Sequence, residues 1–460
     1  MTENKSLNVG QQSLLGYLPA TVIQNIIENR LDFGSRDSDW KNSMPQHYMM
    51  KTVALFADIS GFTKLGEAYA KKGRIGPEFL AFSLNRYMDE LINIIGKSGG
   101  DIFKFAGDAL LVIWPELKKG TINLTEACQR AIQCGLEIQS KLHNVELAGG
   151  QKLSIKVGIG VGECTILVVG GQFRRCEYLS VGEALAQSCI CETKALGGGE
   201  TICHENVKNL VPNVFEYELC TGVDAYGNPY DDAEGRFYRI KRQLGERIAT
   251  KADTYLMRSQ FSSEKIIQKS HLLKSFVPAA ITNYLDIEKE SWSREIRLVS
   301  IMFLNLSISL EDTRTTEGVQ LIQKITNCVQ RCIYRTRGAL NKFLMDEKGS
   351  LMLICWGLPP MSANDDHVKA VYTGLSLMEH LKEYNCGALM GITTGTCFTG
   401  VVGASGGRRE YSLLGGVVNL SARFMQKSCE KAKEHKFKYL CLLDETTKDV
   451  SLLLLLFNKI

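Results

Sequence analysis

The chain has 460 residues, 45% of them hydrophobic and 23% charged, which is the composition of a globular protein with room for two or three domains. The net charge of +4 is small for this length and no basic block stands out, so the sequence gives no case for a nucleic-acid-binding surface. The N-terminus lacks the apolar run of a signal peptide, and no stretch of about 18 apolar residues is present, so no transmembrane segment is expected.

The 15 cysteines are scattered along the chain, often inside apolar segments, as at Cys134, Cys164, Cys355 and Cys441. No CxxC pair repeats at the spacing of a zinc site. This pattern predicts free, buried thiols in a reducing compartment, and hence a cytoplasmic protein.

An internal repeat organises the chain, because four segments of the first half recur in the same order in the second half. The matched pairs are 51–65 with 297–311, 99–114 with 338–356, 153–164 with 386–397, and 174–188 with 408–422. Even the lead-ins, LPATVIQNIIENR and VPAAITNYLDIEK, match. Two copies of one domain are therefore predicted. The predicted boundaries are 1–46 for a lead-in, 47–243 for the first domain, 244–294 for a helical linker and 295–460 for the second domain.

In chain order, the first copy reads as strand, helix, strand pair, helix, strand, strand and helix. Predicted strands, which are apolar runs, lie at 52–59, 101–105, 109–114, 156–162 and 178–182. Predicted helices, with apolar residues at i, i+3 and i+4, lie at 78–99, 124–142 and 183–196, and one more, at 262–276, falls in the linker. Ser60 is a good N-cap for a helix that follows the first strand. This order predicts an α+β fold, with helices over a mixed sheet.

Asp58 ends the first apolar strand and precedes Ser-Gly-Phe-Thr at an expected helix start. Unpaired backbone N–H groups at a helix N-terminus bind anions, and Gly61 lets the backbone approach a phosphate closely. A carboxylate beside a phosphate cradle suggests Mg²⁺, which prefers one or two carboxylates together with phosphate oxygens. The alternative is that Asp58 only caps the helix.

Asp108 lies at the tip of a predicted hairpin in KFAGDAL. By itself it reads as an ordinary turn aspartate. If the first strand neighbours this hairpin, the carboxylates of Asp58 and Asp108 converge on one site. Two metal ions about 3.5–4 Å apart could then clamp the attacking and leaving oxygens of an in-line displacement.

The segments FADISGFTKL, GGDIFKFAGDALL and EYSLLGGVVNLSARF resemble the class III nucleotide cyclases. The resemblance covers about residues 50–430, and the tandem arrangement is similar to the bicarbonate-regulated soluble adenylyl cyclases of this family. It implies two ferredoxin-like cyclase domains that form a pseudo-symmetric, intramolecular head-to-tail pair, so a monomer could suffice. It also implies conversion of ATP to cyclic AMP and pyrophosphate.

The resemblance implies that Asp58 and Asp108, helped by the Ile59 carbonyl, hold two divalent cations, Mg²⁺ or Mn²⁺, with Ca²⁺ as a further candidate. Lys342 and Ser412 would contact adenine. Asn419 would orient the ribose, and Arg423, one helical turn further on, would stabilise charge on the phosphates. The full set of ATP-binding residues implied in this way is Ser60, Gly61, Phe62, Thr63, Gly107, Lys342, Ser412, Leu413, Asn419 and Arg423.

A second site is expected where the two halves exchange their contributions, but it lacks the residues needed for catalysis. Asn305 stands where Asp58 stands in the first copy, and the asparagine and arginine positions fall on Ala186 and Ile190. The resemblance implies a regulatory pocket instead, with Lys104, Val181, Cys189 and Met345. Cys189 replaces an arginine that holds bicarbonate in the family, which argues against bicarbonate control.

Lys342 can donate to an acceptor on adenine but meets a donor on guanine, which favours ATP. A one-turn misalignment would place Asp346 or Glu347 there and leave guanylyl cyclase as an alternative. A second alternative is a catalytically impaired nucleotide- or anion-binding sensor, because the second domain ends before the further strands that the family has. A P-loop ATPase or phosphodiesterase is disfavoured, since GxxxxGK[ST] and a His/Asp cluster are lacking.

Overall fold

The computed structural model describes most of the chain, in ranges separated by short gaps. The described residues are 7–31, 44–61, 76–107, 109–116, 123–147, 150, 152–224, 227, 230, 235–248, 261–282, 284–285, 295–346, 349–403 and 407–448. Three residues singled out by the sequence, Phe62, Thr63 and Asp108, lie outside these ranges. Within the described residues, no helix combines the length and the apolar character needed to cross a membrane.

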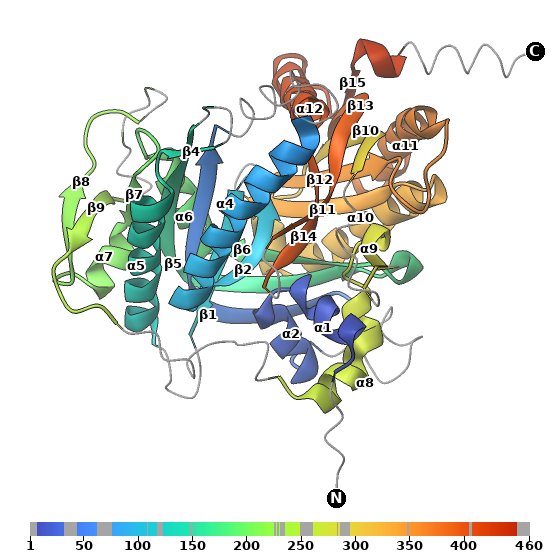
Figure 1. Cartoon of the computed structure of the whole chain (residues 1–460). Helices are drawn as coiled ribbons and strands as arrows, with labels where there is room; N and C mark the ends of the chain where they lie inside the picture. Colours follow the sequence, from blue (N-terminus) through green and yellow to red (C-terminus); the bar gives the residue numbers. More distant parts are fainter. Residues whose placement is uncertain are drawn as a thin grey trace, which may run out of the picture.

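The first half of the chain forms a mixed sheet that is nine-stranded in its described part, with the order β2-β3-β1-β5-β7-β9-β8, while β4 and β6 also pair with β5 (Figure 1). Its strands are β1 (Gln46–Ser60), β2 (Asp101–Ala106), β3 (Ala109–Pro115), β4 (Val145–Glu146), β5 (Lys152–Gly170), β6 (Cys176–Gly182), β7 (Thr201–His204), β8 (Phe215–Leu219) and β9 (Phe237–Gln243). The helices of this half are α4 (Gly76–Ser98), α5 (Leu124–Leu142), α6 (Glu183–Thr193) and α7 (Glu205–Leu210). The predicted hairpin and helices are confirmed in the described residues.

The second half forms a sheet that is six-stranded in the described residues, with the order β11-β12-β10-β13-β14 and with β15 beside β13. Its strands are β10 (Glu295–Leu306), β11 (Ala339–Asp346), β12 (Gly349–Trp356), β13 (Ala388–Gly403), β14 (Arg409–Leu414) and β15 (Tyr439–Leu443). Its helices are α10 (Thr316–Arg335), α11 (Asp366–His380) and α12 (Gly416–His435). The strands β11, β12, β10, β13, β14 and β15 correspond, in that order, to β2, β3, β1, β5, β6 and β7. The repeat in the sequence is therefore also a repeat in sheet topology.

A register shift recurs at the same place in both sheets. In β2 it lies between Ile102 and Lys104, and in β11 between Leu340 and Lys342. A β-bulge of this kind re-aims the side chain beside it. The matched bulges therefore set the direction of two corresponding lysines, a feature that residue patterns alone did not reveal.

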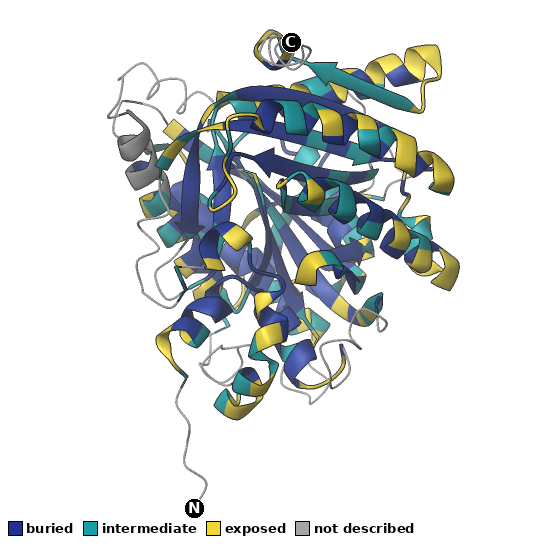
Figure 2. Cartoon of the chain, turned by 90° about the vertical axis from the view of Figure 1, so that its right-hand side faces the viewer, coloured by how far each residue is buried: buried dark blue, intermediate teal, exposed yellow. Residues whose placement is uncertain are grey.

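Helices from the N-terminal segment and from the linker join the two halves. The helices α1 (Val9–Gly16), α2 (Ala20–Ile27) and α8 (Ser263–Lys274) pack together, with the short α9 (Ala279–Thr282) close by in sequence (Figure 1). Their apolar residues share one core with Phe103 of the first sheet and with Ile301 and Tyr411 of the second. Figure 2 shows the resulting arrangement, with buried strands inside and exposed residues on the outer faces of the helices.

Two separate cores lie on either side of this shared one. The core of the first half includes Val402 of β13, with Leu414 of β14 packed against it. The core of the second half includes Leu167 and Val181 of the first half. Each sheet therefore contributes side chains to its neighbour's core, which brings the two candidate sites to the contact between the halves.

Candidate functional site

The predicted carboxylate site begins at the end of β1, between two strands. Asp58 pairs in register with Ala109 of β3 and with Lys156 of β5, and its side chain is half-buried. Ala109 directly follows Asp108, and the β2–β3 turn closes between Ala106 and Ala109. Strand pairing therefore places Asp58 beside the end of the β2–β3 hairpin, while Asp108 itself lies outside the described residues.

Two glycines near Asp58 have positive φ angles. Gly61 has a φ of 101°, and a Cβ there would come within 2.8 Å of the Lys152 carbonyl oxygen. Gly107, in the β2–β3 turn, has a φ of 75°. Both values are in the left-handed region, which a glycine adopts without a steric penalty. Ser60 is the last residue of β1, and the helix predicted to follow it lies outside the described residues.

The residues present fit a divalent cation at this position. Asp58 supplies a half-buried carboxylate, and the Ile59 side chain is buried, which fixes the backbone whose carbonyl is the second candidate ligand. Oxygen ligands of this kind suit Mg²⁺ and Ca²⁺. Among the described residues, no group of three or more His, Cys, Asp or Glu side chains converges.

The second half brings its predicted residues to α12 and β14. Asn419 and Arg423 are both exposed, one turn apart on α12, while Val418, Ser421 and Met425 form the buried face of that helix. The Ser421 hydroxyl donates to the carbonyls of Ile301 and Gly391, at 3.1 and 2.8 Å, and so fixes α12 against the sheet. The packing of α12 against the sheet therefore leaves the face with Asn419 and Arg423 exposed.

The residues predicted to recognise the base are buried on β11 and β14. Lys342 is buried on β11 and forms an ion pair of 3.3 Å with Glu410 of β14. Ser412, two residues further along β14, and Leu413 are also buried. Asn341 donates to the Tyr411 carbonyl at 3.1 Å, which connects β11 to β14 directly. Glu410 is a site residue that the sequence analysis missed; its place beside Tyr411, matched by Glu177 beside Tyr178, was the available signal.

A buried charge cluster connects the two lysines across the halves. Lys104 is buried and lies 4.2 Å from the centre of the Tyr178 ring. Burial lowers the pKa of Lys104, against the opposing effect of Glu177 and Glu410. Burial also raises the pKa of Glu177 to about 7, although Lys104 and Arg175 oppose the shift. Acidic and basic side chains from both halves thus interact in the region between the two candidate sites.

The four residues predicted for a regulatory pocket are brought together in one cavity of about 360 Å³. Lys104, Val181, Cys189 and Met345 all line it. So do Ala186 and Ile190, the positions that correspond to Asn419 and Arg423. Apolar side chains from both halves make up most of the rest, and Asn305, half-buried on β10, corresponds to Asp58.

Sequence comparison identifies the class of the first half. Residues 45–218 match the family model of the adenylate and guanylate cyclase catalytic domain. The fold agrees, because a solved structure of a class III adenylyl cyclase-like ATP-binding protein from Pseudomonas aeruginosa superposes with a TM-score of 0.52 at 12% identity, over 97% of this chain and 94% of that one. Residues 45–218 are therefore similar to the class III cyclase catalytic domain, and the chain has the mixed α+β fold of that solved structure.

More particular relatives are adenylate cyclases. Adenylate cyclase type 10 of Rattus norvegicus is 26% identical over 398 residues, which is 84% of this chain and 24% of that protein. The Homo sapiens protein of the same name is 26% identical over 393 residues, 81% of this chain and 23% of that protein. The chain thus spans about a quarter of the length of these relatives.

Proposed function

We propose that this chain is an adenylyl cyclase that converts ATP to 3′,5′-cyclic AMP and pyrophosphate at the contact between two cyclase domains, 47–243 and 295–460, which pair head to tail. A linker at 244–294 would join them, and one chain would supply a whole site. The observation that carries the proposal is a division of residues between two sheets of the same topology. Only the first has a carboxylate at the end of its β1-type strand, and only the second has the Asn419–Arg423 pair.

In this proposal each half has its own task. Asp58 and Asp108, with the Ile59 carbonyl, would hold divalent cations, which supply positive charge for the triphosphate. Lys342, oriented by Glu410, and Ser412 would bind the base, and Asn419 would position the ribose. The ribose 3′-hydroxyl loses its proton to water, its oxygen attacks the α-phosphorus, and the bond from the α-phosphorus to the bridging oxygen breaks, so that pyrophosphate leaves. Arg423 would stabilise the charge that develops on the phosphate oxygens, which is usually a large part of catalysis.

The test uses Asp58→Asn, with Asn305→Ala at the corresponding position of the second half as the matched control. Cyclic AMP formation from ATP with Mn²⁺ or Mg²⁺ is measured by chromatography. We expect a loss of at least about 100-fold for Asp58→Asn and little change for Asn305→Ala. Equal loss in both variants, or none in either, would contradict the site. ATP binding without turnover in the unmodified chain would indicate a sensor, and faster turnover of GTP would indicate a guanylyl cyclase.

The cavity around Lys104 has the character of a regulatory site. In the part of the chain that the structure describes, the Lys104 amine has no hydrogen bond or ion pair within 4 Å, although it is buried at the cavity wall. Glu177 and Glu410 act on Lys104 without forming an ion pair with it, so an anionic ligand beside the amine would be stabilised. Cys189 offers no bidentate donor. We therefore expect activity to change little with bicarbonate at fixed pH, and a several-fold rise would contradict this.

A further inference from the structure

Two cysteines lie one helical turn apart on α10, at Cys328 and Cys332. All fifteen cysteines are free, and these two lie on the same face of the helix because they are four residues apart. Cys328 is buried at 3% exposure, whereas Cys332 is half-buried and therefore reachable from solvent. This arrangement places an accessible thiol directly over a buried one.

Neighbouring groups favour the thiolate form of Cys332. Its sulfur lies 3.8 Å from the Ser376 hydroxyl of α11, which in turn lies 3.3 Å from Nδ1 of His380. The neighbouring Cys328 thiol lowers the pKa of Cys332 to about 6, with Ser376, His380 and Arg331 acting in the same direction and burial opposing them. By contrast, burial raises the pKa of Cys429, which is also half-buried and helical.

We propose that Cys328 and Cys332 form a peroxide-reactive dithiol, in which Cys332 is the attacking thiol and Cys328 resolves the product as a reversible disulfide. The inference is independent of the proposed cyclase function. It rests on an accessible thiol, a second thiol one turn away on the same helix face, and the polar Ser376 and His380 side chains on the facing helix. Accessible thiolates beside a resolving thiol are the sites that oxidise selectively.

The chemistry needs only hydrogen peroxide as oxidant. The Cys332 thiolate attacks one peroxide oxygen, the O–O bond breaks, and the leaving hydroxide takes a proton to become water. The resulting sulfenic acid is then attacked by the Cys328 sulfur, which forms the S–S bond and releases a second water. The two sulfurs lose two electrons in total, and the peroxide gains them.

The disulfide would strain the last turn of α10. Residues four apart in a helix have Cα atoms about 6 Å apart, within the range of a disulfide, but their Cβ atoms are about 5–6 Å apart, which is too far. The turn must therefore deform, and strained disulfides are more easily reduced.

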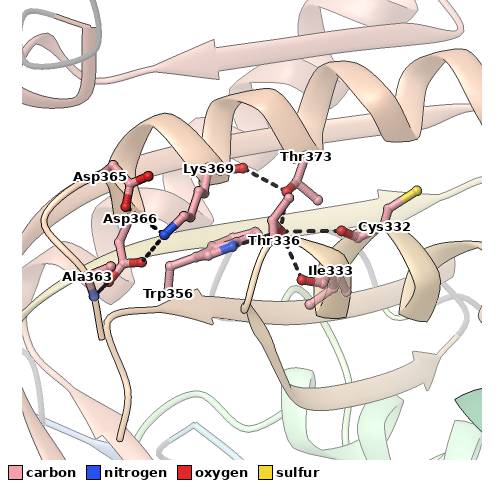
Figure 3. A network of polar contacts seen from close by, with 9 residues as sticks. All are labelled: Cys332, Ile333, Thr336, Trp356, Ala363, Asp365, Asp366, Lys369 and Thr373. Atoms are coloured by element: carbon pink, nitrogen blue, oxygen red, sulfur yellow. Dashed lines mark hydrogen bonds and ion pairs between the residues drawn. The ribbon is translucent and has the colours of Figure 1, made fainter. Parts of the chain in front are cut away.

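A polar network depends on the same turn (Figure 3). The Thr336 hydroxyl donates to the Cys332 and Ile333 carbonyls, at 3.3 and 2.9 Å, and contacts Thr373 of α11 at 2.8 Å. The Trp356 indole donates to Thr336 at 3.2 Å. We therefore expect oxidation to loosen the packing of α10 against α11 and to lower the melting temperature reversibly.

The test treats the reduced full chain with hydrogen peroxide and maps its tryptic peptides. Trypsin cuts after Arg331, so ITNCVQR and CIYR stay together only if Cys328 and Cys332 are disulfide-bonded. We expect this linked pair after peroxide, and its loss after dithiothreitol. In Cys328→Ser, a dione probe for sulfenic acids should label Cys332.

Cys429→Ser is the matched control and should behave like the unmodified chain, whereas Cys332→Ser should give no linked pair. Iodoacetamide at pH 7 should modify Cys332 roughly tenfold faster than Cys429. Absence of the linked pair, or dione labelling of Cys429 as strong as that of Cys332, would overturn the proposal. Peptide mapping of the unmodified chain tests for the disulfide even if a variant fails to fold. The test is also independent of the proposed cyclase function, because it uses no cyclase assay.

Discussion

Single residues carry the difference between the two candidate sites. The sheets repeat one topology, and the bulges repeat too. However, Asp58 corresponds to Asn305 in the second copy, and Asn419 and Arg423 correspond to Ala186 and Ile190 in the first. A carboxylate binds a divalent cation far better than a neutral amide does. In the proposed function, this asymmetry gives one site its catalytic residues and leaves the other as a cavity.

At this scale, Lys342→Met tests base recognition. The variant removes a buried, charge-assisted donor that is worth about 1.5–3 kcal/mol, so kcat/KM for ATP should fall about 10- to 150-fold. Lys104→Met, at the matched position beside the other bulge, should leave the KM for ATP nearly unchanged. Steady-state kinetics with ATP and GTP provide the measurement. An equal effect of the two variants would contradict the assignment of Lys342 to the base.

At the scale of elements, the position of α12 depends on close packing against β13. A Cβ at Gly391 would lie 2.5 Å from the backbone nitrogen of Met425 and from the carbonyl oxygen of Ser421. Both are backbone atoms of α12, so the helix would have to move, and Asn419 and Arg423 would move with it.

Gly391→Ala should therefore lower both the melting temperature and the turnover of ATP. The cost should be about 1–3 kcal/mol, as for other overpacked sites. Gly395→Ala on the same strand is the control, because its Cβ would meet only the Val417 side chain, at 3.3 Å. Thermal unfolding and cyclase assays of both variants provide the comparison. A harmless Gly391→Ala would show that α12 tolerates displacement.

The charge cluster between β2, β6, β11 and β14 predicts a pH dependence of stability. Glu177 has a pKa of about 7 when folded, raised by burial, against an ordinary value near 4.5, and it faces Lys104, Arg175, Glu410 and Tyr334. The folded state therefore holds a proton between pH 4.5 and 7 that the unfolded state has lost. Its contribution to stability is present below about pH 4.5 and is lost as the pH rises through 7.

Glu177→Gln should remove this dependence. The free energy of unfolding of the unmodified chain, relative to the variant, should fall by as much as about 3 kcal/mol between pH 4.5 and 8. Urea unfolding at a series of pH values measures it, and a difference that stays constant with pH would contradict the assignment.

For the whole molecule, the attachment of the halves to one another matters most. Arg408, which directly precedes β14, is buried and donates to the carbonyls of Ile102 and Gly16, at 3.1 and 3.3 Å, and to the Tyr178 hydroxyl at 2.9 Å. One guanidinium thus joins the second half, the first half and the N-terminal helices. On the other side, Gln323 of α10 bonds both the N–H and the carbonyl of Gly170, each at 2.8 Å.

Arg408→Met should destabilise the chain by about 3–5 kcal/mol, because it leaves several buried acceptors without donors. Thermal unfolding should show a lower first transition, as the halves separate. Arg423→Ala, which removes an exposed guanidinium, should leave the melting temperature within about a degree or two while lowering turnover. Unchanged stability of Arg408→Met would contradict the idea that this residue holds the halves together.

The sequence alone was sufficient for the repeat, for the order of the main strands and helices from β1 to α6, and for the residue types at Asp58, Lys342, Asn419 and Arg423, but it did not predict β7, β8 and β9. Periodicity and residue type are local properties, so reading them needed no coordinates. Other features depend on contacts between residues far apart in the chain. These include the Lys342–Glu410 pair, the matched bulges, the assembly of the pocket by both halves, and the dithiol of Cys328 and Cys332 facing Ser376. Only the tertiary structure decides them, because burial and the meeting of two sheets set which charges and thiols become neighbours.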